Sequence, residues 1–373
     1  MNDNKKVIVA ISGGVDSSVA AWLLLRDGYE VIGATLIMHD HADKAVADAA
    51  AVCAQLKIPH HVLDERQRFA ATVVEPFVSE YLNGRTPNPC LFCNPELKFS
   101  RILELANELN APFMATGHYV RVQKHPRSGR LALARSPAGQ KDQSYFLYRL
   151  TQEQLERLLL PLSGYQKPSV RELAREAGLQ TAGEAATADL PDSQDVCFIQ
   201  SDYVDFLEQY SRRHPQWQTA LKELSLPGPV IDCRTGKEIG RHAGLIRFTP
   251  GQRRGIETSS IERLYTLGRD PQRRALLVGG REEAARTYFE IDNVAFMGIA
   301  ETEPELKLDC RIRNTPASSP GYVRALGKGR YAVELEKPVH APAPGQSAVF
   351  YEEGVIALGG VISGVNTGCP FSK

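Results

Sequence analysis

Small and polar residues near the amino end have the composition of a phosphate-binding turn. The run Ser12-Gly13-Gly14-Val15-Asp16-Ser17-Ser18 follows an apolar stretch at 7–11 and precedes a helix-like stretch at 18–26. Small residues let backbone amides approach an anion closely, and the N-terminus of the following helix adds partial positive charge. The run lacks the lysine with which a Walker A loop reaches the β- and γ-phosphates. The pattern predicts ATP-dependent activation and names no substrate; the alternative is a Gly-Gly turn without a ligand.

Thiols form the second group of residues that could do chemistry. Cys90 and Cys93 make a C-x-x-C pair in a proline-rich loop, and Cys197 lies far downstream. Such a pair lowers the pKa of one thiol and permits disulfide or persulfide exchange, or it supplies two ligands to a metal or cluster. A structural zinc site would use a second such pair, and the sequence has none.

The other cysteines carry no motif. We expect Cys53, on a helix face, and Cys310, in a strand, to be buried as small apolar residues. Cys233 and Cys369 have no companion motif and are assigned structural roles. Seven cysteines in a long chain argue against a disulfide framework and favour thiol chemistry or metal binding at some of them.

Length and charge limit the function classes. At 373 residues the chain is long enough for two or three domains. Its 44 basic and 44 acidic residues cancel, so any RNA contact must come from local patches. No run approaches the ~18 apolar residues of a membrane span, and the stretch after Met1 is too short for a signal peptide. We therefore expect a cytoplasmic protein without a membrane partner.

The first part of the chain alternates strand-like and helix-like segments, which is typical of a parallel sheet covered by helices. Ligands of such sheets lie beyond the carboxyl ends of the strands. A strand over 113–116 would therefore bring Gly117 and His118 close to the Gly13-Gly14 turn. The expected segments are strands at 7–11, 31–37 and 61–63 and helices at 18–26, 44–56, 99–109 and 151–180.

The residue pattern changes after Gln200. Glycine and proline punctuate short β-like pieces up to residue 281, which indicates a small Gly-rich β domain or connector. Regular short strands with turns between them follow at 307–312, 321–325, 331–335, 347–351 and 354–358. This spacing favours a β-barrel module at the carboxyl end.

Six motif blocks, in order along nearly the whole chain, resemble those of bacterial tRNA-specific 2-thiouridylases, which are ATP pyrophosphatases of the PP-loop family. The blocks are 12–18, 84–89, 115–119, 141–147, 251–255 and 344–351. The resemblance implies an α/β fold with an adenine-nucleotide alpha hydrolase-like parallel-sheet domain at 1–202. A small central domain at 203–281 and a tRNA-contacting C-terminal β-barrel at 282–373 would follow.

The same resemblance implies an enzyme that replaces O2 of the wobble uridine of tRNA with sulfur. It would use ATP, Mg²⁺ and a protein-borne persulfide, supplied by a cysteine desulfurase or a sulfur-relay protein. The nucleophile corresponds to Cys93 and the persulfide carrier to Cys197. The ATP site falls on Ala10, Ile11, Ser12, Gly13, Gly14, Val15, Asp16 and Ser17, with Leu36 and Gly117 beside the adenosine. Contacts to tRNA fall on Asn88, Pro89, Cys90, His118, Lys141, Asp142, Gln143, Arg313, Asn314 and Gln346.

The chemistry fits these residue types. A uracil oxygen leaves poorly, whereas adenylation turns it into AMP, which leaves readily. A persulfide on Cys197 would then deliver sulfur to C2, and Cys93 would close a disulfide with Cys197.

Two departures keep alternatives open. Many family members have Asp where this chain has Cys90, so Cys90, Cys93 and Cys197 could instead hold an iron-sulfur cluster that carries the sulfide. Asn314 stands where the family usually has Tyr. Beyond the family, the chain could be an amidotransferase-type synthetase, although it lacks a glutaminase segment. It could also be a non-catalytic RNA-binding or sulfur-carrier protein, although the ATP-loop and thiol residues are intact.

Overall fold

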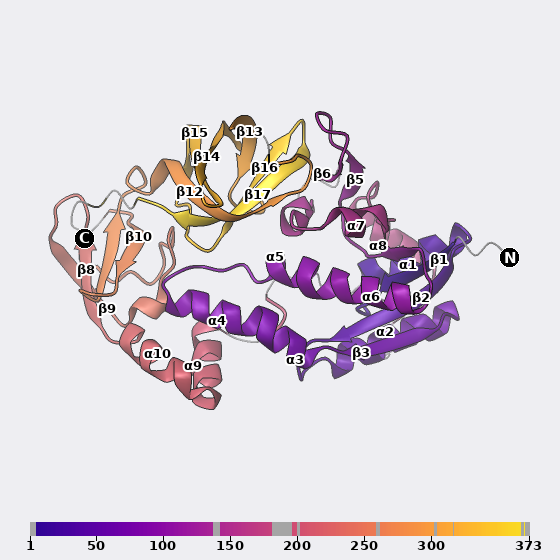
Figure 1. Cartoon of the computed structure of the whole chain (residues 1–373). Coiled ribbons are helices and arrows are strands. Elements are labelled where there is room, and N and C mark those ends of the chain that lie inside the picture. The colour runs from indigo at the N-terminus through magenta and orange to yellow at the C-terminus, as the bar shows by residue number, and fades with distance from the viewer. Residues whose placement is uncertain are drawn as a thin grey trace.

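The computed structural model describes residues 5–136, 142–180, 196–199, 202–258, 262–301, 304–315, 317–366 and 369. Lys141, one of the expected tRNA contacts, lies outside these ranges. Within them, no helix is both long enough and apolar enough to cross a bilayer. Figure 1 shows three units: a helix-covered sheet near the amino end, a small unit at the opposite side, and a barrel above the helices between them.

The first unit is the expected parallel sheet. Its strand order is β3-β2-β1-β4-β7, and every pairing in it is parallel. Val7, Ile8 and Val9 of β1 are completely buried, which is typical of a central strand covered on both faces. The elements are β1 (Lys6–Ala10), α1 (Val15–Arg26), β2 (Glu30–Ile37), α2 (Asp43–Leu56), β3 (His60–Asp64), β4 (Phe113–Ala115), β7 (Leu158–Leu159), α7 (Gln152–Glu156) and α8 (Lys167–Glu176).

Two details of this unit differ from the sequence prediction. Helix α1 begins at Val15 and not at Ser18, so Asp16 and Ser17 lie in its first turn. The continuous helix expected over 151–180 is wrong, because Leu158 and Leu159 form strand β7 on the open edge of β4. Leucine pairs fit both helix and strand periods, and the unpaired edge of β4 decides between them.

Two long helical stretches run between the outer units (Figure 1). The first comprises α3 (Arg66–Phe69), the π-helix η1 (Ala70–Val74) and α4 (Glu75–Leu82). The second comprises α5 (Cys90–Cys93), the π-helix η2 (Asn94–Phe99) and α6 (Ser100–Glu108). The sequence predicted only the end of the second stretch, because Pro89 and Pro95 give its beginning the appearance of a loop.

The middle unit begins with helices that the sequence analysis missed. These are α9 (Tyr203–Arg213), the short η6 (Pro215–Trp217) and α10 (Gln218–Leu224). The expected β pieces then form a four-stranded sheet in the order β10-β11-β8-β9. Its elements are β8 (Gly228–Asp232), β9 (Glu238–His242), η7 (Leu245–Arg247), β10 (Tyr265–Asp270) and β11 (Ala275–Gly279).

This unit contributes one cysteine of a disulfide, whereas the sequence analysis assigned that cysteine only a structural role. Cys233, just after β8, forms a disulfide with Cys369 near the carboxyl end. The two residues are far apart in sequence, and only the tertiary fold brings them together. Cys53 and Cys310 are buried free thiols, as predicted.

The barrel predicted for the carboxyl end is present. A pairing of β12 with β17 closes the sheet β12-β15-β14-β13-β16-β17, and the hairpin β5-β6 from the first half of the chain extends it. The elements are β5 (Arg121–Lys124), β6 (Leu131–Ala134), η4 (Ser144–Leu147), β12 (Ala285–Phe296), β13 (Glu305–Arg311), β14 (Ser319–Gly327), β15 (Arg330–His340), β16 (Ser347–Glu352) and β17 (Val355–Gly364).

A buried interface joins the barrel to the first unit. Tyr145 and Tyr148 pack in one hydrophobic cluster with Val349 and Tyr351 of the barrel. The Tyr148 hydroxyl and the Ser347 hydroxyl are hydrogen-bonded at 3.0 Å. The barrel and the first unit therefore share a continuous hydrophobic core.

Candidate active site

The phosphate turn is held open by its own side chains. The Ser17 hydroxyl donates to the Gly14 carbonyl at 3.1 Å and accepts from the Ser12 backbone N–H at 3.1 Å. Gly13 has a φ of 75°, and a Cβ there would lie 2.6 Å from the Asp48 Cβ. Only glycine fits this position, and the turn leads directly into the N-terminus of α1.

Asp16 is held by two partners from elsewhere in the chain. The Lys167 amine donates to both carboxylate oxygens of Asp16 at 2.7 Å. The buried Tyr119 hydroxyl donates to Oδ1 of the same carboxylate at 2.6 Å. The carboxylate therefore has a fixed orientation at the edge of the turn, with about a third of the side chain, 34%, exposed.

Gly117 lies against the turn, as the parallel sheet predicts. A Cβ on Gly117 would lie 2.7 Å from the Asp16 carbonyl carbon and 2.8 Å from the Ser17 nitrogen. The end of β4 and the start of α1 therefore meet backbone to backbone. Leu36, at the end of β2, is partly buried against the main core.

The neighbouring His118 lies on the other side of this junction. Thr116 Oγ1 and His118 Nδ1 are 2.8 Å apart, and the imidazole packs near the Phe99 ring. Burial, with a contribution from the Lys98 charge, lowers the pKa of His118 to about 3. The imidazole is therefore neutral near pH 7 and acts there as a hydrogen-bonding group.

The three candidate thiols gather beside Lys98. Cys90 and Cys93 begin and end α5, and the electrostatic influence of Cys197 on Cys93 places its thiol nearby. Burial raises the pKa of Cys93 to about 11, and Lys98 opposes that rise. Desolvation by the surrounding protein also raises the pKa of the Cys197 thiol, although the residue as a whole is exposed.

The π-helix η2 explains why Lys98 faces these thiols. In an α-helix, residues 93 and 98 would point roughly 140° apart. A π-helix joins residues five apart by hydrogen bonds, so it brings Lys98 back over Cys93. Burial works to lower the pKa of Lys98, but the thiols, Cys93 first, outweigh it and raise that pKa. The described residues offer Lys98 no carboxylate partner within ion-pair distance.

The thiols do not form a metal site in this arrangement. Among the residues that the structure describes, no group of three or more His, Cys, Asp or Glu side chains is placed to hold a metal ion. Cys90, Cys93 and Cys197 are close enough to influence one another's charge, but as described they are not placed to hold a single metal ion.

The proline-rich loop before the thiols is fixed by the barrel. The Thr86 backbone N–H donates to the Pro344 carbonyl at 2.7 Å, and a Cβ on Gly345 would lie 2.8 Å from the Thr86 nitrogen. The Asn88 side chain accepts from the Cys90 N–H at 3.2 Å, which fixes the chain at the start of α5. Pro89 precedes α5 directly, and the half-buried Gln346 follows the Pro344-Gly345 turn.

Asp142, an expected tRNA contact, is buried and does not lie on the surface. It is 5% exposed, and its Oδ2 accepts from the Arg311 guanidinium at 2.8 Å and from the Ser144 hydroxyl at 3.0 Å. Its other oxygen accepts from the backbone N–H groups of Ser136 and Ser144. As it stands, the carboxylate holds the barrel to the first unit and does not face solvent.

Gln143 contacts Tyr119, whose hydroxyl bonds Asp16 at the phosphate turn. Its side-chain oxygen accepts from the Tyr119 backbone N–H at 2.9 Å, and its own N–H donates to the Tyr119 carbonyl at 3.2 Å.

Arg313 joins the barrel to the 251–255 motif of the middle unit. Its guanidinium donates to the Ala341 carbonyl at 3.1 Å and lies 3.2 Å from where a Cβ on Gly251 would be. Asn314 is exposed beside it. The expected tRNA-contacting pair at 313–314 thus meets the 251–255 motif at this point.

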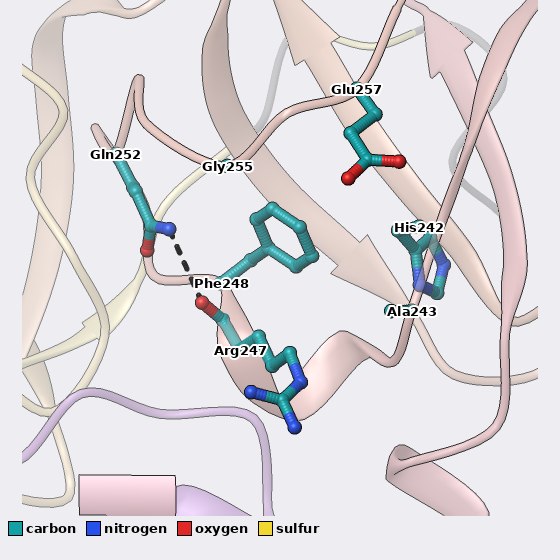
Figure 2. A pocket seen from close by; sticks show the side chains of 7 residues that line it. All are labelled: His242, Ala243, Arg247, Phe248, Gln252, Gly255 and Glu257. Carbon is teal, nitrogen blue, oxygen red and sulfur yellow. Dashed lines mark hydrogen bonds between the residues drawn. The ribbon is translucent and has the colours of Figure 1, made fainter. Parts of the chain in front are cut away.

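The 251–255 motif also forms one wall of a pocket of about 300 Å³ (Figure 2). Gln252 spans the loop, donating to the carbonyls of Arg247 at 3.2 Å and Arg254 at 2.9 Å. All lining residues belong to the middle unit, so this pocket is separate from the thiols. They are His242, Ala243, Arg247, Phe248, Gln252, Gly255 and Glu257.

Three residues of the site were missed in the sequence. Lys98 follows Cys93 by five positions, a spacing that has meaning only inside a π-helix. Lys167 lies far from the turn in sequence and reaches Asp16 only through the fold. Tyr119 belongs to the 115–119 motif, but nothing in its residue type signals that its hydroxyl contacts Asp16.

Three protein-family models match the chain along its length. The model described as "tRNA methyl transferase HUP domain" matches residues 5–201. Those described as "tRNA methyl transferase PRC-barrel domain" and "Aminomethyltransferase beta-barrel domain" match residues 219–280 and 286–362. The parallel sheet, the middle unit and the barrel therefore each have a counterpart among known domains.

Named relatives align over nearly the whole chain. The chain is 40% identical over 372 residues to the tRNA-specific 2-thiouridylase MnmA of Syntrophotalea carbinolica, covering 96% of this chain and 99% of that protein. It is 39% identical over 376 residues to MnmA 2 of Thermoanaerobacter sp. strain X514, covering 97% and 99%. It is 34% identical over 371 residues to MnmA of Clostridioides difficile, covering 96% and 98%.

Proposed function

The chain belongs to the family of tRNA-specific 2-thiouridylases, and from that premise we propose that it adenylates O2 of the tRNA wobble uridine and replaces it with sulfur from a Cys197 persulfide. One observation carries the proposal. Gly117 contacts the phosphate turn, and the adjacent His118 lies close enough to Lys98 for the lysine charge to lower its pKa. Lys98 in turn lies beside the thiols. Consecutive residues thus connect the site for ATP with the site for sulfur.

ATP would bind with its phosphates over the turn at 12–17. The Gly13-Gly14 backbone and the N-terminus of α1 supply donors for the phosphates, and Lys167 supplies a positive charge at the same edge. The exposed part of the Asp16 carboxylate is suited to Mg²⁺, which prefers oxygen ligands. When bound, the ion neutralises charge on the phosphates as pyrophosphate leaves.

Sulfur transfer would follow at the thiols. The terminal sulfur of the Cys197 persulfide attacks C2 of the adenylated uridine, and AMP leaves with the former O2. The Cys93 thiolate then attacks Sγ of Cys197, which breaks the S–S bond, leaves sulfur on C2 and forms a Cys93–Cys197 disulfide. A cellular thiol reductant supplies the two electrons that reopen it. Lys98 is placed to offset negative charge on these sulfurs.

The donor of the persulfide sulfur is, in this proposal, a cysteine desulfurase or a sulfur-relay protein, in the cytoplasm. The exposed position of Cys197 suits transfer from such a protein. The alternative route is a cluster on Cys90, Cys93 and Cys197 that carries the sulfide.

The test is a thiolation assay with ATP, a sulfur donor and unmodified tRNA, with 2-thiouridine measured by mass spectrometry. Cys93→Ser and Cys197→Ser should each abolish the product. Cys53→Ala is the matched control, because this buried thiol lies in the same unit behind β2 and should leave activity intact. Full activity in either active-site variant would refute the persulfide route. Iron analysis of anaerobically purified protein tests the cluster separately.

A further inference from the structure

Tyr119 connects the ATP turn to the segment at 142–143. Its side chain is 2% exposed, and its hydroxyl donates to Asp16 Oδ1 at 2.6 Å. A hydrogen bond from a neutral donor to a carboxylate is stronger than one between neutral groups. Because Tyr119 is packed inside the core next to Val15 and Val19, its ring has little freedom to move away from the carboxylate.

The backbone of Tyr119 is fixed as firmly as its side chain. The Tyr119 backbone N–H donates to the side-chain oxygen of Gln143, and the Tyr119 carbonyl accepts from the Gln143 backbone N–H. The next residue back, Asp142, is locked by the buried Arg311 of the barrel. Tyr119 is therefore held from the barrel side and holds Asp16 on the ATP side.

Lys167, the other partner of Asp16, differs from Tyr119 in one respect. As a cation it can exchange the carboxylate for a phosphate of ATP, since both are anions. The Tyr119 hydroxyl carries no charge and is buried in the core, so a phosphate attracts it less strongly than it attracts the Lys167 ammonium group. It is the partner suited to keep Asp16 oriented once ATP is bound.

We propose that Tyr119 is a positioning residue for adenylation, in that its hydroxyl orients the Asp16 carboxylate for the step that releases pyrophosphate. The inference rests on the proposed role of Asp16 in the ATP site. Loss of a hydrogen bond to a charged group should slow this step by about tenfold or more. Because orientation matters most in the transition state, kcat should fall with little change in KM for ATP.

The experiment measures pyrophosphate release by the full chain with unmodified tRNA at varied ATP concentration. The variant is Tyr119→Phe, which removes only the hydroxyl. Tyr148→Phe is the matched control: its hydroxyl is also buried and bonds the Ser347 hydroxyl at 3.0 Å, but it does not contact Asp16. Thermal unfolding of both variants establishes how much stability each hydroxyl contributes.

The expected result is a lower kcat in Tyr119→Phe alone, with KM for ATP and tRNA affinity near wild type. Equal loss of kcat in Tyr148→Phe would mean that a buried hydroxyl matters only for stability, and would overturn the inference. Unchanged kcat in Tyr119→Phe would also overturn it. Asp16→Ala distinguishes the proposed role of Asp16 from the inference about Tyr119. If Asp16→Ala releases pyrophosphate normally, the proposed role of Asp16 fails. If Asp16→Ala is inactive while Tyr119→Phe is normal, only the inference fails.

Discussion

The amine of Lys167, the first residue of α8, lies 2.7 Å from both carboxylate oxygens of Asp16, in the first turn of α1. Two helix beginnings, far apart in sequence, are thus joined by one ion pair at the phosphate turn. A cation and a carboxylate at the same edge can rearrange around an incoming Mg²⁺–ATP, with the lysine exchanging the carboxylate for a phosphate.

Lys167→Met should therefore weaken ATP binding and slow pyrophosphate release, each by about tenfold. Lys167→Arg should recover part of both effects, since the charge is restored with a different geometry. ATP affinity is measured by calorimetry without tRNA, so that RNA binding does not obscure the result. Wild-type ATP affinity in Lys167→Met would contradict the placement of phosphates beside this lysine.

Gly117→Ala should disrupt the turn through its contacts with the backbone of α1. Its Cβ would lie 2.7 to 2.8 Å from backbone atoms of Asp16 and Ser17, which cannot move aside as a side chain can. We expect ATP affinity to fall by more than about tenfold, because the amides of the turn are displaced. Gly164→Ala is the matched control, since nothing lies within 4 Å of its Cβ position.

Much of this fold could be predicted from the sequence, for identifiable reasons. The apolar strand and small-residue turn at 7–18 report local structure directly, and the alternation of elements places Gly117 near that turn. The helices over 203–224 were missed because the glycines and prolines that follow them dominated the interpretation. The Cys233–Cys369 disulfide was missed because neither cysteine has a neighbouring motif.

The site was predictable to the extent that its residues lie in motifs. The residue types in the turn at 12–17 and in the C-x-x-C pair indicate their chemistry directly. Lys98 faces the thiols because it lies in a π-helix, and Tyr119 contacts Asp16 through a buried hydroxyl. Neither feature has a distinctive sequence pattern. Asp142 shows the converse case, since a polar residue that was expected to contact tRNA is a buried partner of Arg311 in the structure. The domain boundaries at 202 and 281 stay predictions.

The Asp142–Arg311 pair should make a large contribution to stability. Both side chains are about 5% exposed or less, so Asp142→Asn leaves the guanidinium buried without its countercharge. The expected loss is about 3 to 5 kcal/mol in the free energy of unfolding by urea. Glu336→Gln is the matched control: it breaks the exposed Lys307–Glu336 pair and should cost less than about 1 kcal/mol. Similar losses in the two variants would mean that the buried pair does not dock the barrel.

Lys98 should set the pH at which Cys93 becomes reactive. Burial raises the pKa of Cys93 to about 11 and Lys98 opposes that rise, so removing the charge should raise the pKa further. Because the thiolate is the reactive form and appears as pH increases through the pKa, alkylation of Cys93 in Lys98→Met should shift to higher pH. In Lys98→Arg, which keeps the charge, Cys93 should be alkylated nearly as in wild type.

Iodoacetamide labelling between pH 7 and about 11, followed by mass spectrometry of the Cys93 peptide, measures the shift. Lys44→Met, on the exposed face of α2, controls for the loss of one positive charge from the same unit. If Lys98→Met and Lys44→Met label with the same pH profile, the charge of Lys98 does not act on the thiols, and sulfur transfer must proceed without it.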